Sequence, residues 1–329
     1  MKFPARHWVV ERGKARCRLC PHHCLIPEGG SGRCLGRENI GGKLFATNYG
    51  EVISAAMDPV EKKPLYHFLP GAEVLSVATW GCNLACPFCQ NSDISQHRVP
   101  SRFIPPGQLV RLAREHRAPA VAFTYTEPLT WFEYLLDACP ELRAAGVRTI
   151  LVTNGMIEPG PLAELLPHVD AMNVDLKAMR PEFYRDYVKG SLAAVQNTIR
   201  AAAESCHLEV TNLVIPGRND TDEDLAELAG FVAGLGRRVP LHFSRYFPRF
   251  REREHETPVE TLARAAETAR RQLDYVYLGN VSADPCFRDT FCPQCGNRLV
   301  ERSGYHGRVV GIADGRCDQC GRAADFVLQ

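Results

Sequence analysis

Hydrophobic and polar positions follow two patterns between residues 73 and 281, where short runs rich in β-branched side chains alternate with longer amphipathic segments. The short runs predict strands at 74–79, 120–125, 147–153, 171–176, 208–215 and 241–246, with 275–278 as an additional candidate. The longer segments predict helices at 106–116, 130–144 with a break near Pro140, 161–166, 192–205, 222–235 and 259–272. Strands that alternate with helices pair in parallel through right-handed crossovers. We therefore expect an α/β fold of six strand–helix units, either an open or partial barrel or a doubly wound sheet.

Both ends of the chain lack this periodicity and are rich in cysteine and glycine. We predict an N-terminal metal-binding module at 1–50, a connecting segment at 51–72, the barrel at 73–285, and a C-terminal zinc-ribbon or rubredoxin-like module at 286–329. Modules this small bury little core and commonly need a metal to hold them together.

The composition narrows the function classes. Of 329 residues, 45% are apolar and 23% charged, as in ordinary globular proteins. The formal charge of +1 provides no basic field, so we expect neither nucleic acid nor an anionic membrane as a partner. The chain shows no apolar run of roughly 18 residues and no secretory signal at its start. We therefore expect a cytoplasmic location.

Cysteine is unusually frequent for that compartment, with fourteen residues. In a reducing cytosol, grouped cysteines are more often metal ligands than disulfides. The groups are Cys17, Cys20, Cys24 and Cys34; Cys82, Cys86 and Cys89; and Cys292, Cys295, Cys317 and Cys320. The sequence therefore predicts three metal sites.

The central group, C-x3-C-x2-C, directly follows the first predicted strand. Thiolates ligate iron–sulfur clusters, and a cubane needs four attachments for full protein ligation. Three cysteines would leave one iron open, as a catalytic metal site requires. On spacing alone, a zinc loop or an electron-transfer cluster completed by a distant cysteine stays open.

The outer groups each offer four thiols. The C-terminal group forms two C-x2-C-G turns, in which Gly296 and Gly321 permit a positive φ. This pattern favours structural tetrahedral zinc, with rubredoxin-like iron as the alternative. The N-terminal group, C-x2-C-x3-C-x9-C, suits zinc or an auxiliary 4Fe–4S cluster equally, and His22 or His23 could replace one cysteine.

The central array, with Phe88 directly before its third cysteine, resembles the signature of the radical S-adenosylmethionine (SAM) superfamily. The resemblance implies a partial (β/α)6 barrel in which Cys82, Cys86 and Cys89 hold a 4Fe–4S cluster that binds SAM at its open iron. One-electron reduction would then cleave SAM to a 5′-deoxyadenosyl radical, which abstracts hydrogen from a substrate. It also implies an external electron donor of the flavodoxin or ferredoxin type.

Further motifs follow the later predicted strands, where a β/α barrel gathers its active site. Thr124-Tyr-Thr-Glu-Pro is similar to the motif that contacts the SAM amino group in activase-like members, and Thr153-Asn-Gly to the ribose-side motif. Asp175-Leu-Lys resembles a motif of pyruvate formate-lyase activase in which the lysine approaches SAM, and Ile215-Pro resembles the adenine-side motif. Taken singly, each is equally typical of a turn or a solvated ion pair. The implied SAM contacts are Phe88, Thr126, Glu127, Thr153, Asn154, Asp175, Lys177, Ile215 and Pro216.

One position departs from that activase. An aspartate that contributes to a monovalent cation site precedes its Thr-Asn-Gly motif, whereas Val152 stands here and offers no ligand atom. This part of the resemblance is missing.

Cys17-Arg-Leu-Cys-Pro-His-His-Cys and Asp58-Pro-Val-Glu-Lys-Lys-Pro add a resemblance to the radical SAM member of the AmmeMemoRadiSam system, which is related to pyruvate formate-lyase activase. It implies association with an AMMECR-type and a Memo-type protein but no particular reaction. Weaker candidates for the substrate side are Glu61, Lys62, Lys63, His67 and His242, all of which also fit a structural role.

Three functions follow: an enzyme acting on an unidentified small molecule, an activase that generates a glycyl radical on a partner protein, and a non-catalytic iron–sulfur or zinc protein. The order of the SAM-site motifs along the chain argues against the third.

Overall fold

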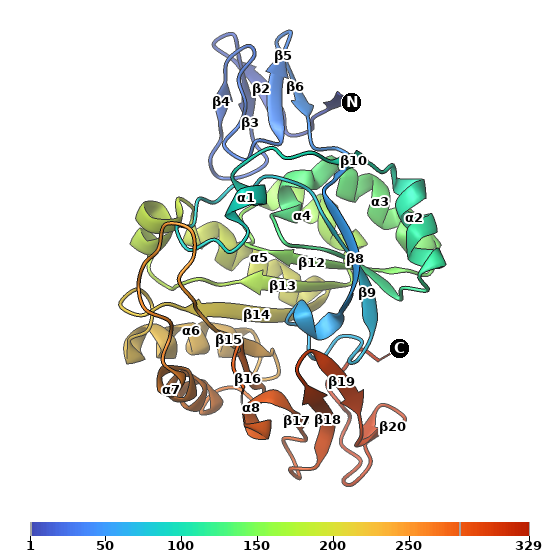
Figure 1. The fold of residues 1–329 in the computed structure, drawn as a ribbon, viewed down its shortest axis with the longest axis vertical. Helices are drawn as coiled ribbons and strands as arrows, with labels where there is room; N and C mark the ends of the chain where they lie inside the picture. The colour runs from blue at the N-terminus through green and yellow to red at the C-terminus, as the bar shows by residue number, and fades with distance from the viewer. Residues whose placement is uncertain (1, 283, 329) are drawn as a thin grey trace.

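The computed structural model describes residues 2–282 and 284–328, which are built around an eight-stranded sheet (Figure 1). Its order is β16-β15-β14-β13-β12-β11-β9-β8. The strands are β8 (Ser54–Pro59), β9 (Glu73–Ala78), β11 (Ala120–Phe123), β12 (Arg148–Thr153), β13 (Ala171–Asp175), β14 (His207–Val214), β15 (Leu241–Arg245) and β16 (Val276–Gly279). All neighbours pair in parallel except β8, which runs antiparallel to β9.

Helices connect the parallel strands in turn: α2 (Pro106–Glu115), α3 (Phe132–Ala144), α4 (Pro159–Leu165), α5 (Leu192–Ser205), α6 (Asp222–Leu235) and α7 (Val259–Arg270). This alternation confirms the α/β class and the parallel sheet. From β9 to β16, neighbours in the sheet follow one another in sequence. A doubly wound sheet would reverse its strand order instead, so that alternative is wrong.

Two helices show how local residues set their course. Thr221 caps α6 by accepting a hydrogen bond from the Asp224 backbone N–H at 3.1 Å, with acidic residues in the first turn. The expected break at Pro140 is wrong, because α3 continues through it. A proline inside a helix costs about 3 kcal/mol, and the buried face of α3, which includes Leu135 and Leu142, offsets that cost.

The segment 51–72, expected to be a connection, contributes β8 to the main sheet. Its register runs from Ser54 opposite Ala78 to Pro59 opposite Glu73. A 3-10 turn (Val60–Lys62) follows directly and returns the chain towards β9. The strand lacks a clear hydrophobic alternation, so its pairing with β9 defines it rather than its own sequence.

The cysteine-rich ends form small sheets at opposite ends of the molecule's long axis (Figure 1). The N-terminal module contains β1 (Phe3–Pro4), β5 (Arg37–Ile40) and β6 (Lys43–Ala46) in one sheet and β2 (Trp8–Glu11), β3 (Lys14–Cys17) and β4 (Leu25–Ile26) in another. The C-terminal module contains β17 (Thr290–Phe291), β18 (Arg298–Ser303), β19 (His306–Val309), β20 (Ile312–Ala313) and β21 (Arg316–Cys317). The remaining short strands and α-helices are β7 (Glu51–Val52), β10 (Arg102–Phe103), α1 (Ser92–Ser95) and α8 (Pro285–Arg288). Two further 3-10 turns (Pro128–Trp131 and Leu166–His168) and a π-helix (Phe183–Val188) complete the described elements.

The main core lies between the parallel sheet and its helices. Val121, Leu151 and Val174 on the strands and Leu228 on α6 are almost wholly buried within it. Because helices bury such parallel strands, the sequences of these strands are near-continuous apolar runs. Among the described helices, none combines the length and apolar character needed to cross a membrane.

Candidate active site

A cavity of about 450 Å³ opens at the carboxyl ends of the parallel strands. Its walls include Cys82, Cys86, Phe88, Cys89, Thr126, Glu127, Thr153, Asn154, Asp175 and Lys177. The fold therefore brings together the central cysteines and most of the residues that the sequence assigns to SAM. Val152, at the position that departs from the activase, also lines the cavity as an apolar side chain.

The cysteine loop follows β9 and begins with a constrained glycine. Gly81 has a φ of 96°, and a side chain there would collide with the carbonyl oxygen of Cys34. Within the loop, the Cys82 sulfur accepts hydrogen bonds from the Leu84 backbone N–H at 3.4 Å and from Asn154 Nδ2 at 3.5 Å. Such donors stabilise charge on cluster-bound sulfur and tune its potential.

The central thiols fit a cluster better than a single ion. Burial raises the pKa of Cys82 well above its ordinary value and that of Cys86 to about 12. Thiolates at such positions need a nearby cation, which bound iron would supply. Within 2–282 and 284–328, the C-terminal quartet alone brings three or more ligand atoms within 4.8 Å of one another. The central three therefore stand wider apart than around one ion, with no converging fourth ligand.

Glu127 links the ends of β11 and β12. Its Oε1 accepts hydrogen bonds from the Leu129 N–H at 2.9 Å and the Thr153 hydroxyl at 2.6 Å, and its Oε2 accepts one from the Asn154 N–H at 2.8 Å. Burial raises the pKa of Glu127 to about 7, although these donors lower it. Because Oε2 accepts only one of these bonds, it retains acceptor capacity for an ammonium group in the cavity.

Asp175, the last residue of β13, and Lys177 just after the strand form an ion pair, with Lys177 Nζ 2.8 Å from Asp175 Oδ2. Burial acts to lower the pKa of Lys177, but the charges of Asp175 and Cys86 raise it above its ordinary value. The Lys177 ammonium also lies 5.9 Å from the centre of the Phe88 ring. A fixed positive charge therefore stands beside the cysteine loop, where it can meet a carboxylate.

Ile215 and Pro216 follow β14 but do not line this cavity. Both are buried, and the Ile215 N–H donates to Asn219 Oδ1 at 2.7 Å, which turns the chain away. Thr211 and Leu213, within β14 itself, line the wall instead. The adenine-side assignment of Ile215 and Pro216 stays a prediction.

A partly buried ion-pair network supports the loop after β11; the sequence analysis named its lysines but not their pairing with Asp58. Asp58 on β8 binds Lys62 Nζ at 2.7 Å and Lys63 Nζ at 2.8 Å, and it accepts a hydrogen bond from the Tyr125 hydroxyl. Tyr125 has a φ of 69°, and Asn91 Nδ2 donates to its carbonyl at 2.6 Å. The i,i+4 spacing of Asp58 and Lys62 was a usable signal, but the pairing with Tyr125 is not visible in sequence. The network holds Thr126 and Glu127 in place.

The part of the cavity wall away from the cysteine loop carries further polar groups. His242 Nε2 lies 2.6 Å from Glu209 Oε2, and His207 Nε2 lies 3.0 Å from Glu209 Oε1. Although burial acts to raise it, these hydrogen bonds hold the pKa of Glu209 well below its ordinary value. Glu61 lines the same cavity; its Oε1 accepts from the Gly71 N–H at 2.9 Å and lies 3.8 Å from Arg302 Nε. Its Oε2 is buried without a hydrogen-bond partner in the described part of the chain. His242 therefore lines the barrel as considered, and one oxygen of Glu61 retains acceptor capacity.

His67 does not reach the cavity. Its ring is buried between the sheet and the C-terminal module, with Nε2 2.6 Å from the Tyr277 hydroxyl. The stacked Phe326 ring lies 4.3 Å away. Its role here is structural packing.

The predicted C-terminal quartet is assembled. The sulfurs of Cys292 and Cys320 are 3.6 Å apart, as are those of Cys295 and Cys317. Sulfurs bound to one tetrahedral zinc, each roughly 2.3 Å from the ion, stand about 3.8 Å apart. The geometry therefore fits one metal ion, and zinc as its identity stays a prediction.

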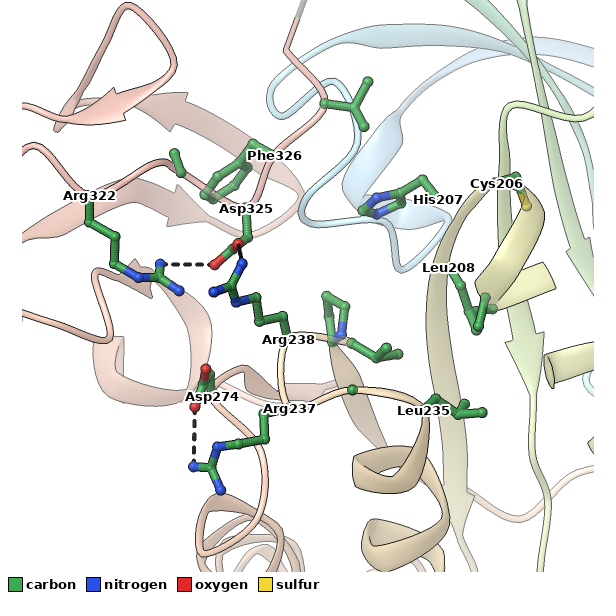
Figure 2. A pocket seen from close by; sticks show the side chains of 16 residues that line it. Cys206, His207, Leu208, Leu235, Arg237, Arg238, Asp274, Arg322, Asp325 and Phe326 are labelled. Atoms are coloured by element: carbon green, nitrogen blue, oxygen red, sulfur yellow. Dashed lines mark hydrogen bonds and ion pairs between the residues drawn. The ribbon is translucent and has the colours of Figure 1, made fainter. Parts of the chain in front are cut away.

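A wider open groove of about 820 Å³ lies at the opposite, amino end of β14 (Figure 2). Its charged groups are already paired: Arg322 with Asp325 at 2.9 Å, Arg238 with Asp325 at 3.3 Å, and Arg237 with Asp274 at 3.2 Å. None of the grouped cysteines lines it. Its side chains offer no comparable chemistry.

The fold and the first cavity define an α/β enzyme with a three-cysteine site open to a large pocket. The model of the Radical SAM superfamily matches residues 77–232, which include that site. The chain belongs to the radical SAM superfamily and is an enzyme of that class.

Among its relatives is a protein of Methanocaldococcus jannaschii, "Uncharacterized protein MJ0808", which is 42% identical over 328 residues and aligned over 97% of both chains. The pyruvate formate-lyase-activating enzyme of Staphylococcus epidermidis is 25% identical over 173 residues, covering 48% of this chain and 68% of that protein. A solved radical SAM methyltransferase from Sphaerobacter thermophilus aligns with a TM-score of 0.51 at 19% identity, over 64% of this chain and 67% of that one. This last likeness concerns the fold alone.

Proposed function

We propose that the protein cleaves SAM reductively and uses the resulting 5′-deoxyadenosyl radical to abstract hydrogen from a substrate. A 4Fe–4S cluster on Cys82, Cys86 and Cys89 would supply the electron and an open iron for SAM. The observation that carries the proposal is the single cavity lined both by these cysteines and by most of the SAM-site residues. An external donor of the flavodoxin or ferredoxin type would provide the reducing electron.

The chain's own residues would orient SAM by charge. Glu127 offers Oε2 to the amino group, and Lys177 offers a fixed positive charge to the carboxylate. Thr153 and Asn154 are held at the cavity wall by their hydrogen bonds to Glu127. Binding and orientation by preformed groups lowers the entropic barrier of the reaction.

The substrate side favours a small polar molecule with a hydrogen-bond donor. Glu61 presents a buried acceptor without a partner in the described chain, and His242 and Lys62 line the same cavity. The cavity of about 450 Å³ would also hold the cluster and SAM, so the space left beside them suits a small substrate.

Glycyl-radical formation on a partner protein is the second candidate. Its support is the similarity to the pyruvate formate-lyase-activating enzyme, which spans 48% of this chain. The sequence resemblance to the AmmeMemoRadiSam system supports a further proposal, that an AMMECR-type and a Memo-type protein act with this enzyme. We also propose that the C-terminal quartet binds zinc and that the protein is located in the cytoplasm.

The test is SAM cleavage by anaerobically reconstituted, dithionite-reduced protein, followed as 5′-deoxyadenosine by liquid chromatography and mass spectrometry. We expect product from the wild-type protein and none from Cys86→Ala. Cys206→Ala, at an isolated cysteine, is the matched control and should retain activity. Absence of product from wild-type protein that carries an intact central cluster would refute the proposal.

A further inference from the structure

The four cysteines of the N-terminal module line one largely enclosed cavity. Cys17 ends β3, Cys20 and Cys24 lie in the loop to β4, and Cys34 lies in the loop before β5. The Cys17 N–H donates to the carbonyl oxygen of Cys24 at 3.0 Å, which closes the first loop. The fold thus gathers all four thiols of the motif around a common space.

The cavity suits an anionic complex of soft ligands. Its walls are mainly apolar, and Arg37, only 1% exposed, lines it as well. Arg37 Nη2 lies 2.8 Å from the Glu133 carboxylate, while its Nε has no hydrogen-bond partner among the residues the structure describes. Glu133 balances the charge of Arg37, but the buried Nε–H is an unused donor, which is costly without an acceptor. Thiolates of a metal centre in this cavity would provide such an acceptor.

Backbone amides also face the sulfurs. The N–H groups of Leu19, His22 and Gly36 donate to the sulfurs of the cysteines two residues before them. Amide donors of this kind stabilise metal-bound thiolate and tune the potential of iron–sulfur clusters. This feature is shared by zinc and iron sites, so it supports a metal site without identifying the metal.

The separation between the four sulfurs distinguishes a zinc ion from an iron–sulfur cluster. Four sulfurs at roughly 2.3 Å from one zinc leave no room for a water molecule between them. The N-terminal quartet is not among the described groups whose ligand atoms converge within 4.8 Å. A cubane holds its cysteine sulfurs further apart than one ion does, so the wider separation of these four thiols favours a cluster.

We propose that Cys17, Cys20, Cys24 and Cys34 bind a second 4Fe–4S cluster. All four irons would have a protein thiolate, so this cluster has no open position for SAM. Its chemistry is therefore electron transfer rather than SAM cleavage.

The quartet directly adjoins the central cysteine loop. The backbone of Gly81, one residue before Cys82, packs against the carbonyl of Cys34. His22 Nε2 lies 2.6 Å from the carbonyl oxygen of Asn83, and Asn83 itself lines the N-terminal cavity. If the proposed function holds, a one-electron donor protein reduces the auxiliary cluster from the 2+ to the 1+ state. That electron then passes to the central cluster, and the auxiliary cluster returns to 2+.

Metal and sulfide analysis of the anaerobically reconstituted full chain gives the first test. We expect about eight iron and eight acid-labile sulfide atoms per chain, four of each for every cubane. A wild-type protein with about four iron atoms and two zinc ions would overturn the proposal. This count does not depend on any variant folding.

A variant with Cys82, Cys86 and Cys89 replaced by alanine isolates the N-terminal site from the proposed SAM chemistry. It should keep about four iron atoms per chain and give the EPR signal of one reduced 4Fe–4S cluster. Adding Cys20→Ser should abolish both iron and signal, whereas adding Cys206→Ser should change neither. Zinc without iron in the folded triple variant would disprove the second cluster while leaving the central one untested.

The closeness of the two proposed clusters can be tested by EPR spectroscopy of the wild-type protein. Two reduced paramagnetic clusters this near should couple, so the wild-type EPR spectrum should be broader than the signal of the triple variant. A spectrum that equals the sum of two isolated signals would contradict the electron-transfer role.

Discussion

The two outer cysteine quartets have the same number and kind of ligands, yet the chain spaces them differently. In the C-terminal module, each pair sits on a tight turn closed by Gly296 or Gly321, with φ of 76° and 74°. Those turns bring the sulfurs into contact distance. In the N-terminal module, only Cys17 and Cys20 share the two-residue spacing of those pairs, and longer loops bring in Cys24 and Cys34 around a cavity. The comparison teaches that backbone spacing, rather than the number of thiols, selects between one ion and a cluster.

The largest expected difference between the quartets is in stability. Cys317→Ala should remove the C-terminal metal and unfold residues 286–329, because structural zinc contributes about 10–16 kcal/mol of apparent binding free energy in small domains. Zinc analysis and limited proteolysis measure this. Iron content should stay unchanged, and the exposed Cys286→Ala is the control. Loss of iron together with zinc would contradict the expectation that the two quartets hold different metals independently.

The next effect concerns the charge beside the N-terminal cavity. Arg37→Leu should lower the free energy of unfolding by about 3–5 kcal/mol, because it leaves the buried Glu133 carboxylate without its ion-pair partner. Chemical denaturation followed by circular dichroism measures the loss. Combining Arg37→Leu with Glu133→Gln should recover part of it. A single variant as stable as the wild type would show that the bound metal centre does not need this cation.

The central site differs from both quartets because it leaves room for SAM, and its binding should depend on pH. Glu127 has a pKa raised to about 7 by burial, so it becomes a carboxylate only above that pH. The affinity for SAM should therefore rise by roughly tenfold between pH 6 and pH 8, as measured by equilibrium dialysis. Over the window from about 4.5 to 7, the free energy of unfolding should fall as pH rises, since the folded state binds the extra proton. Glu127→Gln should flatten both profiles.

The smallest effect concerns the surface contact between the N-terminal module and the segment after α1. Arg98 donates to the Leu35 carbonyl at 2.9 Å and pairs with Glu38 at 3.2 Å, with 42% of its side chain exposed. Arg98→Ala should lower stability by only about 1 kcal/mol, as expected for solvent-screened interactions. Thermal unfolding measures this shift, and iron content should be unchanged. A loss of iron would mean that this contact holds the N-terminal site together.

The sequence predicted most of the fold because its strands carry their own signal. The buried strand β11 is apolar along its length, β12 contains the apolar run Ile150-Leu-Val, and the helices between the strands are amphipathic. β8 was missed because its sequence lacks that pattern and it pairs with β9 through long-range contacts. Local periodicity cannot report pairing that depends on a partner elsewhere in the chain.

The site was predictable wherever ligand chemistry lies in short motifs. The cysteines, Glu127 and Lys177 met in one cavity because each follows a neighbouring parallel strand. Ile215 was placed in that cavity on the same reasoning, but the hydrogen bond from its N–H to Asn219 turns the chain away. The hydrogen bond from the Tyr125 hydroxyl to Asp58 depends on a left-handed backbone conformation at Tyr125, which the residue types in this segment do not predict.

The hairpin between β18 and β19 carries Tyr305 into the wall of the catalytic cavity. Gly307 on the same hairpin packs so closely against Glu61 that any side chain there would collide with it. Arg302 reaches inward to donate to the Tyr66 carbonyl at 2.7 Å. The C-terminal module therefore forms part of the wall of this cavity. If its four cysteines bind a metal, loss of that metal should alter the cavity wall while leaving the three central cysteines in place.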